Sequence, residues 1–313
     1  MAKATKKKKA TKKTTAPKTR PEVKLNRGTG MLVIEVRHSN PNGDPDAESE
    51  PRTIDSDGRG LISPVSVKRK LRDIVAEKES AVWAMAAKEI GLNGKATDRR
   101  YEILESRGRD RDAIFKMSAD EFMDEFWDGR VFGNTFLEAI KGKSIEPGEK
   151  DHFISTGVVQ FGPGISIAPI EIERLTTTNK SGVEEGKDRG MAPLGWRVVQ
   201  HGVYTMPFFV NPMMAGKNAC DEKDIDLLKF LIPHLFKLTA SASRPHVEIL
   251  HAWYAEHKSP LGSCPDSMIL DSLQPTKKKD PDTPSTAIGE YSIPDTLPPK
   301  VKSRIKSIND LCG

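Results

Sequence analysis

The stretch from Met31 to Val75 most constrains the fold, because it changes from strand to turn to helix. Alternate residues of Met31–Arg37 are apolar on one side, which is the two-residue period of a β-strand. The segment Asn40–Asp46 cannot continue this strand, because it contains two prolines and an Asn-Gly pair. The chain therefore leaves a sheet through a polar turn before its next element begins.

A basic helix is predicted to follow. Ser63 and Pro64 supply an N-cap and a first-turn proline. Apolar residues then recur at helical spacing and predict a buried stripe, formed by Val67, Leu71, Ile74 and Val75. Four cations occupy the same turns, namely Lys68, Arg69, Lys70 and Arg72. The N-terminus of a helix is already electropositive, so a cation cluster there destabilises the helix. This cost favours the interpretation that the cations contact phosphates over the interpretation that they form an ordinary solvated face.

The turn Asn40–Asp46 admits several chemistries. Its asparagines and aspartates could bind a metal, contact a phosphate or serve in acid–base cleavage of RNA through Asp44 and Asp46. A cluster of Asx-turns explains the same residues without any function. The sequence leaves these alternatives open.

The next region, residues 79–150, reads as a helical insertion. Helices are predicted at Ala81–Ile90 and Ser118–Trp127. Glycines at Gly129 and Gly133 flank Arg130, which would let the backbone approach a ligand closely. A tight turn with an Arg–Asp pair is the alternative interpretation.

Strand character returns in Phe153–Ile172, with a kink predicted at Gly162–Gly164. The polar stretch Thr176–Gly190 then precedes a further strand at Trp196–Phe209, which predicts a projecting hairpin. Met191, beside Lys187 and Arg189, suits a wedge against unstacked bases, although a loop with an incidental methionine would look the same.

The last part of the chain supplies one more helix and one more strand. Asp221–Leu238 has helical periodicity, with Pro233 predicting a break. His246–Tyr254 is a predicted strand with Val247, Ile249 and His251 on one side. Gln274–Thr286 reads as a linker, and a short strand follows at Ile288–Ile293. The histidines are expected to be structural rather than metal ligands.

In order, these elements give β-α-β-β-α-β, which is an α+β fold of the ferredoxin-like or RNA-recognition-motif (RRM) type with two large insertions. Such sheets often bind single-stranded RNA through aromatic residues on the sheet face. The usual aromatic pattern is absent here, so the loops and the basic helix are expected to hold RNA instead.

Charge and cysteine content indicate where RNA could bind on the protein and in which compartment the protein is expected. The net charge is +5, but Met1–Arg20 contributes +9, so the remainder carries −4 and any RNA-binding face is local. Residues 1–30 are expected to be a disordered basic tail, either solubilising or able to bind nucleic acid without register. Three scattered cysteines indicate a reducing, cytoplasmic setting, and no stretch predicts a secretory signal or a membrane span.

Four segments carry a resemblance to a known family. They are Asn40–Asp46, Val67–Arg72, Asp128–Gly133 and Gly157–Gln160, within a region from Met31 to His257. They resemble the backbone subunit of CRISPR Cascade complexes, in the type I-C and I-B branch of the RAMP (repeat-associated) proteins.

The resemblance implies a hand-like protein that polymerises head to tail along CRISPR RNA and presents its spacer to target DNA in antiviral defence. Residues 31–273 would form the RRM palm, 79–150 the helical fingers and 176–197 the hairpin thumb, with residues 274–313 as linker and extension. It implies no catalytic residue, cofactor or metal, and other Cascade subunits as partners. The candidate RNA-binding residues are Asn40, Asn42, Lys68, Arg69, Lys70, Arg72, Arg130, Asn134, Gln160, Lys180, Lys187, Arg189 and Met191. The alternatives are a RAMP-type endoribonuclease using Asp44 and Asp46, and a general single-stranded RNA-coating protein.

Overall fold

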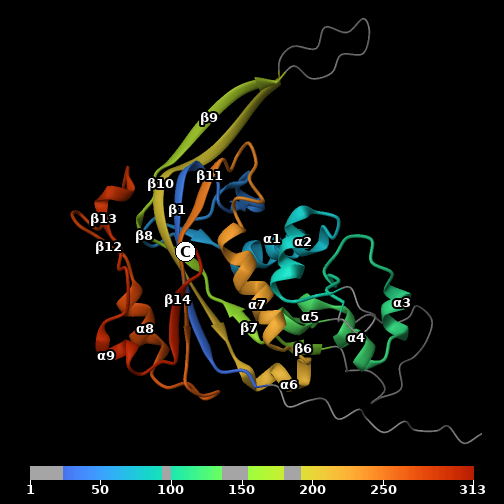
Figure 1. Cartoon of the computed structure of the whole chain (residues 1–313). Coiled ribbons are helices and arrows are strands. Elements are labelled where there is room, and N and C mark those ends of the chain that lie inside the picture. The colour runs from blue at the N-terminus through green and yellow to red at the C-terminus, as the bar shows by residue number, and fades with distance from the viewer. Residues whose placement is uncertain (1–23, 94–99, 136–153, 180–191) are drawn as a thin grey trace, which may run out of the picture.

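A large antiparallel sheet forms the centre of the molecule (Figure 1). The computed structural model describes residues 24–93, 100–135, 154–179 and 192–313. The strand order is β14-β11-β1-β10-β8-β4. These strands are β14 (Ser307–Asp310), β11 (His246–Glu256), β1 (Gly28–Ser39), β10 (Ala192–Val210), β8 (Gly164–Pro169) and β4 (Arg59–Ile62). β7 (Val159–Phe161) and β9 (Ile172–Asn179) also pair with β10. The predicted mixed α and β fold is therefore confirmed.

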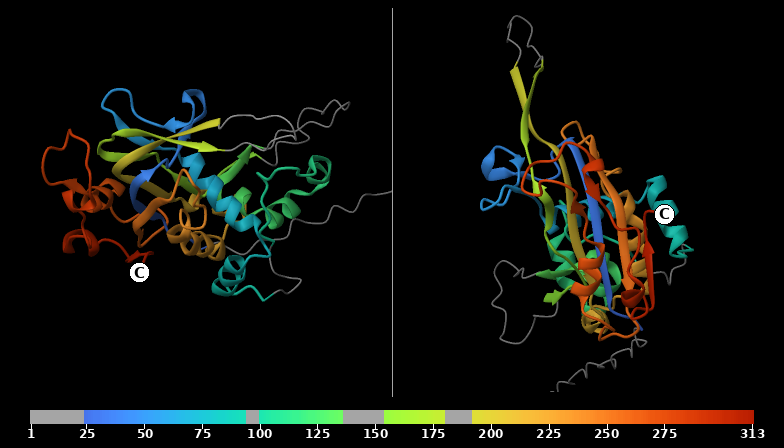
Figure 2. Two further views of the ribbon diagram at one scale, coloured as in Figure 1. Left: turned by 90° about the horizontal axis from the view of Figure 1, so that it is seen from above. Right: turned by 90° about the vertical axis from the view of Figure 1, so that its left-hand side faces the viewer.

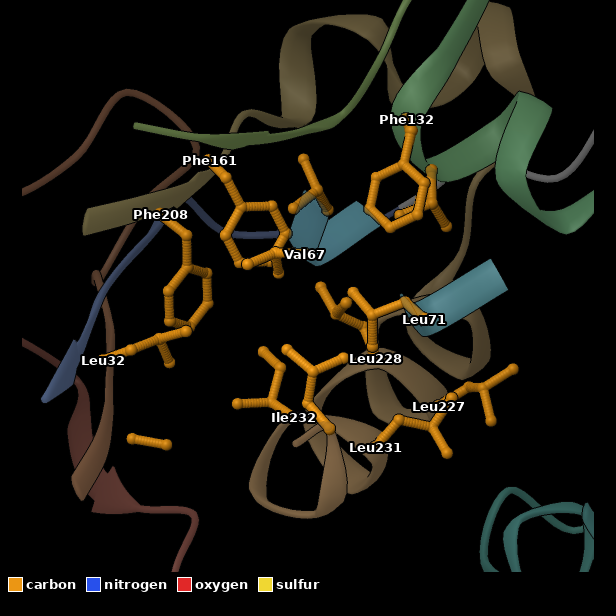
Figure 3. Close-up of a cluster of buried hydrophobic side chains, with 14 of the residues drawn as sticks. Leu32, Val67, Leu71, Phe132, Phe161, Phe208, Leu227, Leu228, Leu231 and Ile232 are labelled. Carbon is orange, nitrogen blue, oxygen red and sulfur yellow. The ribbon is translucent and has the colours of Figure 1, made fainter. Parts of the chain in front are cut away.

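One face of the sheet packs against two helices, α1 (Pro64–Ala76) and α7 (Glu222–Leu231). Leu32 of β1 and Phe208 of β10 belong to one buried cluster with Leu71 of α1 and Leu228 of α7, as Figure 3 shows. The predicted N-cap is confirmed, because the Ser63 side chain accepts the Ser66 N–H. Successive side chains of β1 point to opposite faces of the sheet, so alternate residues of β1 form the face on which the helices pack.

The other face of the sheet is covered by the C-terminal segment, so Gln274–Thr286 is not a free linker. Met31 and Trp253 pack against Leu273 and Leu297, and Val33 packs against Tyr291. This segment contains α8 (Asp266–Leu273), β12 (Thr276–Lys277), β13 (Tyr291–Ser292) and α9 (Pro299–Lys302). Figure 2 shows it on the side of the sheet opposite to α1. The sheet face that an RRM would offer to bases is therefore occupied.

The first insertion is helical, as predicted, in the part that the structure describes. It contains α2 (Ala81–Glu89), α3 (Arg111–Lys116), α4 (Ala119–Glu125) and α5 (Trp127–Phe132). Ser118 begins α4 with a capping box that pairs it with Glu121. β5 (Gly133–Thr135) then pairs with β6 (Ile154–Thr156), and β7 follows and joins the main sheet.

The predicted hairpin is formed by β9 and the first half of β10. The register runs from Ile172 opposite Val199 to Asn179 opposite Ala192. Figure 1 shows this pair of strands extending well beyond the rest of the sheet. The predicted wedge residue Met191 lies outside the described residues.

Of two local predictions, the break at Pro233 is confirmed and the face of His251 needs correction. Helix α7 ends at Leu231, and a 3-10 turn (Ile232–His234) holds Pro233, so the helix breaks where predicted but does not resume as far as Leu238. In β11 the pairing register with β1 shifts between Val33 and Ile34. This irregularity puts His251 on the face of Trp253, with which it stacks, rather than on the face of Val247 and Ile249.

Two smaller elements complete the described chain. The turn after β1 contains a short hairpin, β2 (Gly43–Asp44) with β3 (Glu50–Pro51), and α6 (Ala215–Asn218) follows β10. Among the described residues, no helix has the length and apolar character that a membrane crossing needs.

Candidate nucleic-acid interface

The predicted turn and the basic helix lie together, because a side chain of the turn accepts a hydrogen bond from the N-cap residue of α1. The Asn42 Oδ1 atom accepts the backbone N–H of Ser63 at 2.7 Å. Asn40 is buried, and its Nδ2 donates to the carbonyls of Ser49 (2.6 Å) and Arg197 (3.2 Å). These asparagines join the turn to backbone groups distant in sequence, near the start of α1. The contact of the Asx-turn kind is made by Asp44 instead.

The aspartates of the turn are engaged in local structure. Asp44 Oδ1 accepts the Asp46 N–H at 3.0 Å, and its Oδ2 pairs with Arg52 Nη1 at 3.2 Å. His38, the histidine nearest in sequence, faces Glu173 at 3.5 Å. The part of the chain described here holds no group of three or more metal-ligating side chains. Within the described residues, this turn therefore gathers no such cluster, and its nearest histidine pairs with Glu173 rather than with an aspartate of the turn.

The four cations of α1 have different surroundings. Arg69 is exposed and pairs with Asp73 one turn later, at 2.7 Å. Arg72 Nε pairs with the buried carboxylate of Asp128 at 2.8 Å, so its charge is largely committed to the fold. Lys68 is half-buried, with Nζ 5.5 Å from the centroid of the Phe132 ring. Burial, and then the charge of Arg72, lower the pKa of Lys68.

Lys70 is the most enclosed of the four, being 8% exposed. Its Nζ lies 3.4 Å from Ser66 Oγ and 5.8 Å from the Phe236 ring centroid. Burial first, and the charge of Arg244 second, lower its pKa to about 8. Lys68 shares the Phe132 side of α1 with Arg72, Arg69 is exposed, and Lys70 lies on the Phe236 side. The three cations therefore lie on different sides of α1, and Arg72 is the one paired with Asp128.

The prediction that Arg130 contacts RNA is wrong. Arg130 is fully buried, and its Nε and Nη2 donate to both carboxylate oxygens of Asp224 in α7 at 2.8–3.2 Å. Its Nη1 donates to the carbonyls of Met123 and Asp124. Burial alone would lower the pKa of Arg130, but the charge and hydrogen bonds of Asp224 raise it overall. The segment is helix α5 rather than the tight turn of the alternative interpretation, and the aspartate that pairs with Arg130 is Asp224, distant in sequence.

Two further predicted contacts also serve the fold. Asn134 is buried, and its Nδ2 donates to Ser155 Oγ across the β5–β6 pair at 3.2 Å. Gln160 is half-buried and donates to the Gly157 carbonyl at 3.2 Å. Neither lies in the turn or in α1. The remaining predicted contacts, Lys180, Lys187, Arg189 and Met191, lie outside the described residues.

Arg244 is a residue of this surface that the sequence interpretation missed. It sits in the loop Ala240–Pro245, which precedes β11, and its Nε donates to the Asn40 carbonyl at 3.0 Å. The Asn40 N–H in turn donates to the Ser243 carbonyl at 2.8 Å. A single arginine in a Ser-rich turn was the only local signal, and its proximity to α1 depends on a contact more than 200 residues away in sequence.

Comparison with known proteins gives a consistent family match. The family model described as "CRISPR-associated protein Cas7" matches residues 26–295. Among curated proteins, the CRISPR-associated protein Cas7 of Haloferax volcanii is 26% identical over 221 residues, which are 66% of this chain. The chain spans 63% of the length of that relative.

Solved structures with some likeness include two chains from complexes described as "CRISPR RNA-guided surveillance complex", the second in a pre-nicking state. Their TM-scores are 0.39 and 0.41, with 14% and 17% identity, over 73% of this chain and 68% and 75% of theirs. A chain from a Type III-B Cmr-beta complex bound to cognate target RNA has a TM-score of 0.37 and 10% identity, over 74% of this chain and 61% of its own length.

Proposed function

The chain belongs to the family of CRISPR-associated protein Cas7, and from this premise we propose that it is a guide-RNA-binding backbone subunit of a Cascade surveillance complex. The basic surface of α1 is the single observation that carries the RNA-binding role. Lys68, Arg69 and Lys70 lie in consecutive positions beside a turn that is pinned to the helix start. Phosphates are the natural partners of such a surface.

We further propose that β1, α1, β8, β10, α7 and β11 form an RRM-type palm. The antiparallel order β11-β1-β10-β8 and the placement of both helices on one face support this assignment. The insertion between α1 and β7 would be the fingers, and the β9–β10 hairpin the thumb. The RNA would follow the α1 side, because the opposite face packs against the C-terminal segment.

Copies would then associate head to tail along the guide, with the spacer bases left free to pair with target DNA. In that arrangement the protein holds backbone and shape, while base pairing reads sequence. The motif in Asn40–Asp46, followed by the cations of α1, favours the type I-C and I-B branch. The subunit would be non-catalytic, because the Asp44 carboxylate is occupied by Arg52 and by a backbone N–H.

The RNA-binding role is tested by the double variant Lys68→Ala/Arg69→Ala in the full chain. Both side chains lie outside the apolar stripe, so the fold should survive. RNA affinity should fall at least about tenfold, and the salt dependence should flatten by roughly 0.7 for each lost phosphate contact on a single strand. Filter binding to a guide-length RNA at several salt concentrations measures both quantities.

The matched control is Lys88→Ala/Lys217→Ala, which removes the same charge from exposed positions on α2 and α6. Equal losses in both double variants, or none in either, would contradict the assignment of the α1 surface. Native mass spectrometry of the copurified ribonucleoprotein then separates a Cascade subunit from a general coat. A fixed stoichiometry on one RNA length supports the former, and a stoichiometry that grows with RNA length supports the latter.

A further inference from the structure

Lys70 is a buried cation and Arg244 a half-buried one, and neither forms an ion pair among the described residues. Lys70 is 8% exposed, and the nearest groups to its ammonium are the Ser66 hydroxyl and the Phe236 ring. Arg244 is half-buried, and its Nε donates a hydrogen bond to the Asn40 carbonyl. Within the described ranges, no carboxylate lies within 4 Å of either cationic group.

The two cations also oppose each other. The charge of Arg244 lowers the pKa of Lys70, and burial lowers the pKa of both side chains. Asp73 is the acid that counteracts this effect at Lys70, but its carboxylate is bonded to Arg69. Like charges in a partly desolvated site disfavour their own charged forms, so the RNA-free protein holds this pair at a cost in stability.

The described partners of both cations are uncharged. The Lys70 ammonium lies 5.8 Å from the centroid of the Phe236 ring, and a cation–π contact of this kind offsets only part of the cost of burying the charge. The loop contact made by Arg244 uses one N–H group, which a neutral amide could also donate. The two Nη groups of the guanidinium make no hydrogen bond within the described residues, so the fork that suits a phosphate is left available.

We propose that Lys70 and Arg244 together form a preorganised site for one backbone phosphate of the bound RNA. This inference rests on the proposed function and adds a second attachment point, on the loop Ala240–Pro245, to the surface of α1. A phosphate between the two cations would supply the missing negative charge and replace repulsion by two attractions. The arginine fork would fix its orientation, and the ammonium would add a point charge.

A pocket of about 230 Å³ lies beside the proposed site. It is lined by Phe236, Pro245 and His246 among others, so it borders the ring next to the Lys70 ammonium and the residue after Arg244, although neither cation lines it.

The test uses Lys70→Met, Arg244→Gln and the double variant in the full chain, with the guide-length RNA as probe. Each single variant should lose about tenfold in RNA affinity, because a charge-assisted contact is removed. The double variant should lose less than the product of the two, because both residues hold the same phosphate. The RNA-free melting temperature should stay the same or rise in each variant, because the repulsion is relieved. Arg244→Lys should recover part of the affinity.

Two outcomes would overturn the inference. If both single variants keep wild-type affinity while Lys68→Ala/Arg69→Ala loses it, the phosphate site is wrong and the proposed function stands. If the RNA-free protein melts at clearly lower temperature in Lys70→Met and Arg244→Gln alike, the pair is structural. If no cation variant on α1 changes affinity, the proposed function itself fails.

A measurement on the unmutated protein covers the case in which a variant does not fold. A bound phosphate favours the charged form of Lys70, while Arg244 opposes it and Asp73 and Ser66 lie on the same helix face. Wild-type RNA affinity should therefore fall between pH 7 and 8.5, and Lys70→Arg, which keeps its charge, should flatten that fall. Identical pH profiles for the two proteins would contradict the proposal.

Discussion

Arg130 and Lys70 are both buried cations, but only Arg130 is paired with a carboxylate. We relate this difference to a structural role for Arg130 and a binding role for Lys70. Arg130 is fully enclosed between α5 and α7, and Asp224 supplies a carboxylate that matches its fork. Lys70 is 8% exposed on α1 and faces Arg244 and an aromatic ring. A buried cation with a matched anion holds elements together, whereas one without an anion is a place for an anionic ligand.

The largest effect is expected from Arg130→Ala. This change removes the arginine from the buried Asp224 carboxylate, which keeps the Asp221 N–H, and removes one donor from the Met123 and Asp124 carbonyls. The free energy of unfolding should fall by about 3–5 kcal/mol, as is typical when one member of a buried pair is removed. Urea unfolding of the RNA-free protein measures the loss.

Arg100→Ala is the matched control, because its side chain is 72% exposed and pairs with Glu125 at the surface. Its effect should stay below about 0.5 kcal/mol. A loss of similar size in both variants would contradict the distinction between Arg130 and the surface arginines.

Arg72→Ala should give the next largest effect and sharpens the comparison along α1 itself. Asp128 is 1% exposed, and without Arg72 it would keep hydrogen bonds from the N–H groups of Leu104 (2.7 Å) and Glu105 (3.1 Å). Because the carboxylate stays partly satisfied, the unfolding free energy should fall by about 2 kcal/mol. Arg69→Ala, at the exposed neighbouring pair, should cost under about 0.5 kcal/mol in the same urea experiment. Equal losses would show that Arg72 belongs to the free surface.

Local sequence patterns predicted most of the elements on the face of the sheet that packs against α1 and α7. Ser63 and Pro64 marked the helix start, the apolar stripe of α1 marked its buried face, and Pro233 marked the break after α7. These features depend on neighbours within a few residues, which a sequence displays directly. The projecting hairpin could be predicted for the same reason, since a polar excursion between two strands has few other solutions.

The proposed RNA-binding surface was harder to predict, because it depends on contacts between distant segments. In sequence Arg130 and Arg72 resemble Lys68 and Arg69, and only their pairing with Asp224 and Asp128 shows that they stabilise the fold. Arg244 meets Asn40 where the neighbouring strands β11 and β1 end, and it carried no motif. The cover on the second face was missed because its proline-rich composition resembles a linker, although Ser285 and Tyr291 are buried there.

Acid pH should affect the covered face of the sheet, where two buried histidines hold the C-terminal segment. His201 Nδ1 lies 2.7 Å from Ser285 Oγ, and the His257 Nδ1 accepts the Ser263 N–H at 2.9 Å. Burial is the largest cause that lowers the pKa of each. Glu35 and Glu290 oppose that shift at His201, and Asp266 opposes it at His257, while Arg37 and Arg27 respectively reinforce it.

The sign follows from the proton balance. In the unfolded chain a histidine titrates near pH 6.5, so below this pH the unfolded state binds more protons than the folded state. Stability should therefore fall as the pH drops through about 6.5 toward the lowered values, by less than about 1.4 kcal/mol per pH unit for each histidine. Urea unfolding at pH 7.5 and 5.5 measures the loss, and His201→Gln should reduce it. An unchanged difference in that variant would exclude His201 as a source.

The smallest effect is expected from Asp73→Ala. This variant removes an acid beside the cations of α1, whereas the variants above remove cations. Asp73 is the carboxylate that competes with phosphate for Arg69, and its charge also favours the charged form of Lys70. Its removal should cost under about 0.5 kcal/mol in stability, because an exposed pair at one-turn spacing contributes little. RNA affinity should rise about two- to threefold at low salt, because Arg69 loses its competing carboxylate and the RNA no longer passes a negative charge. The gain should vanish at high salt, because salt screens interactions between exposed charges. Glu89→Ala removes the same charge from an exposed position on α2 and should leave RNA affinity unchanged. A decrease in affinity for Asp73→Ala would mean that the carboxylate orients Arg69 toward the RNA, and the cations of α1 would then act as a paired network rather than as a free surface.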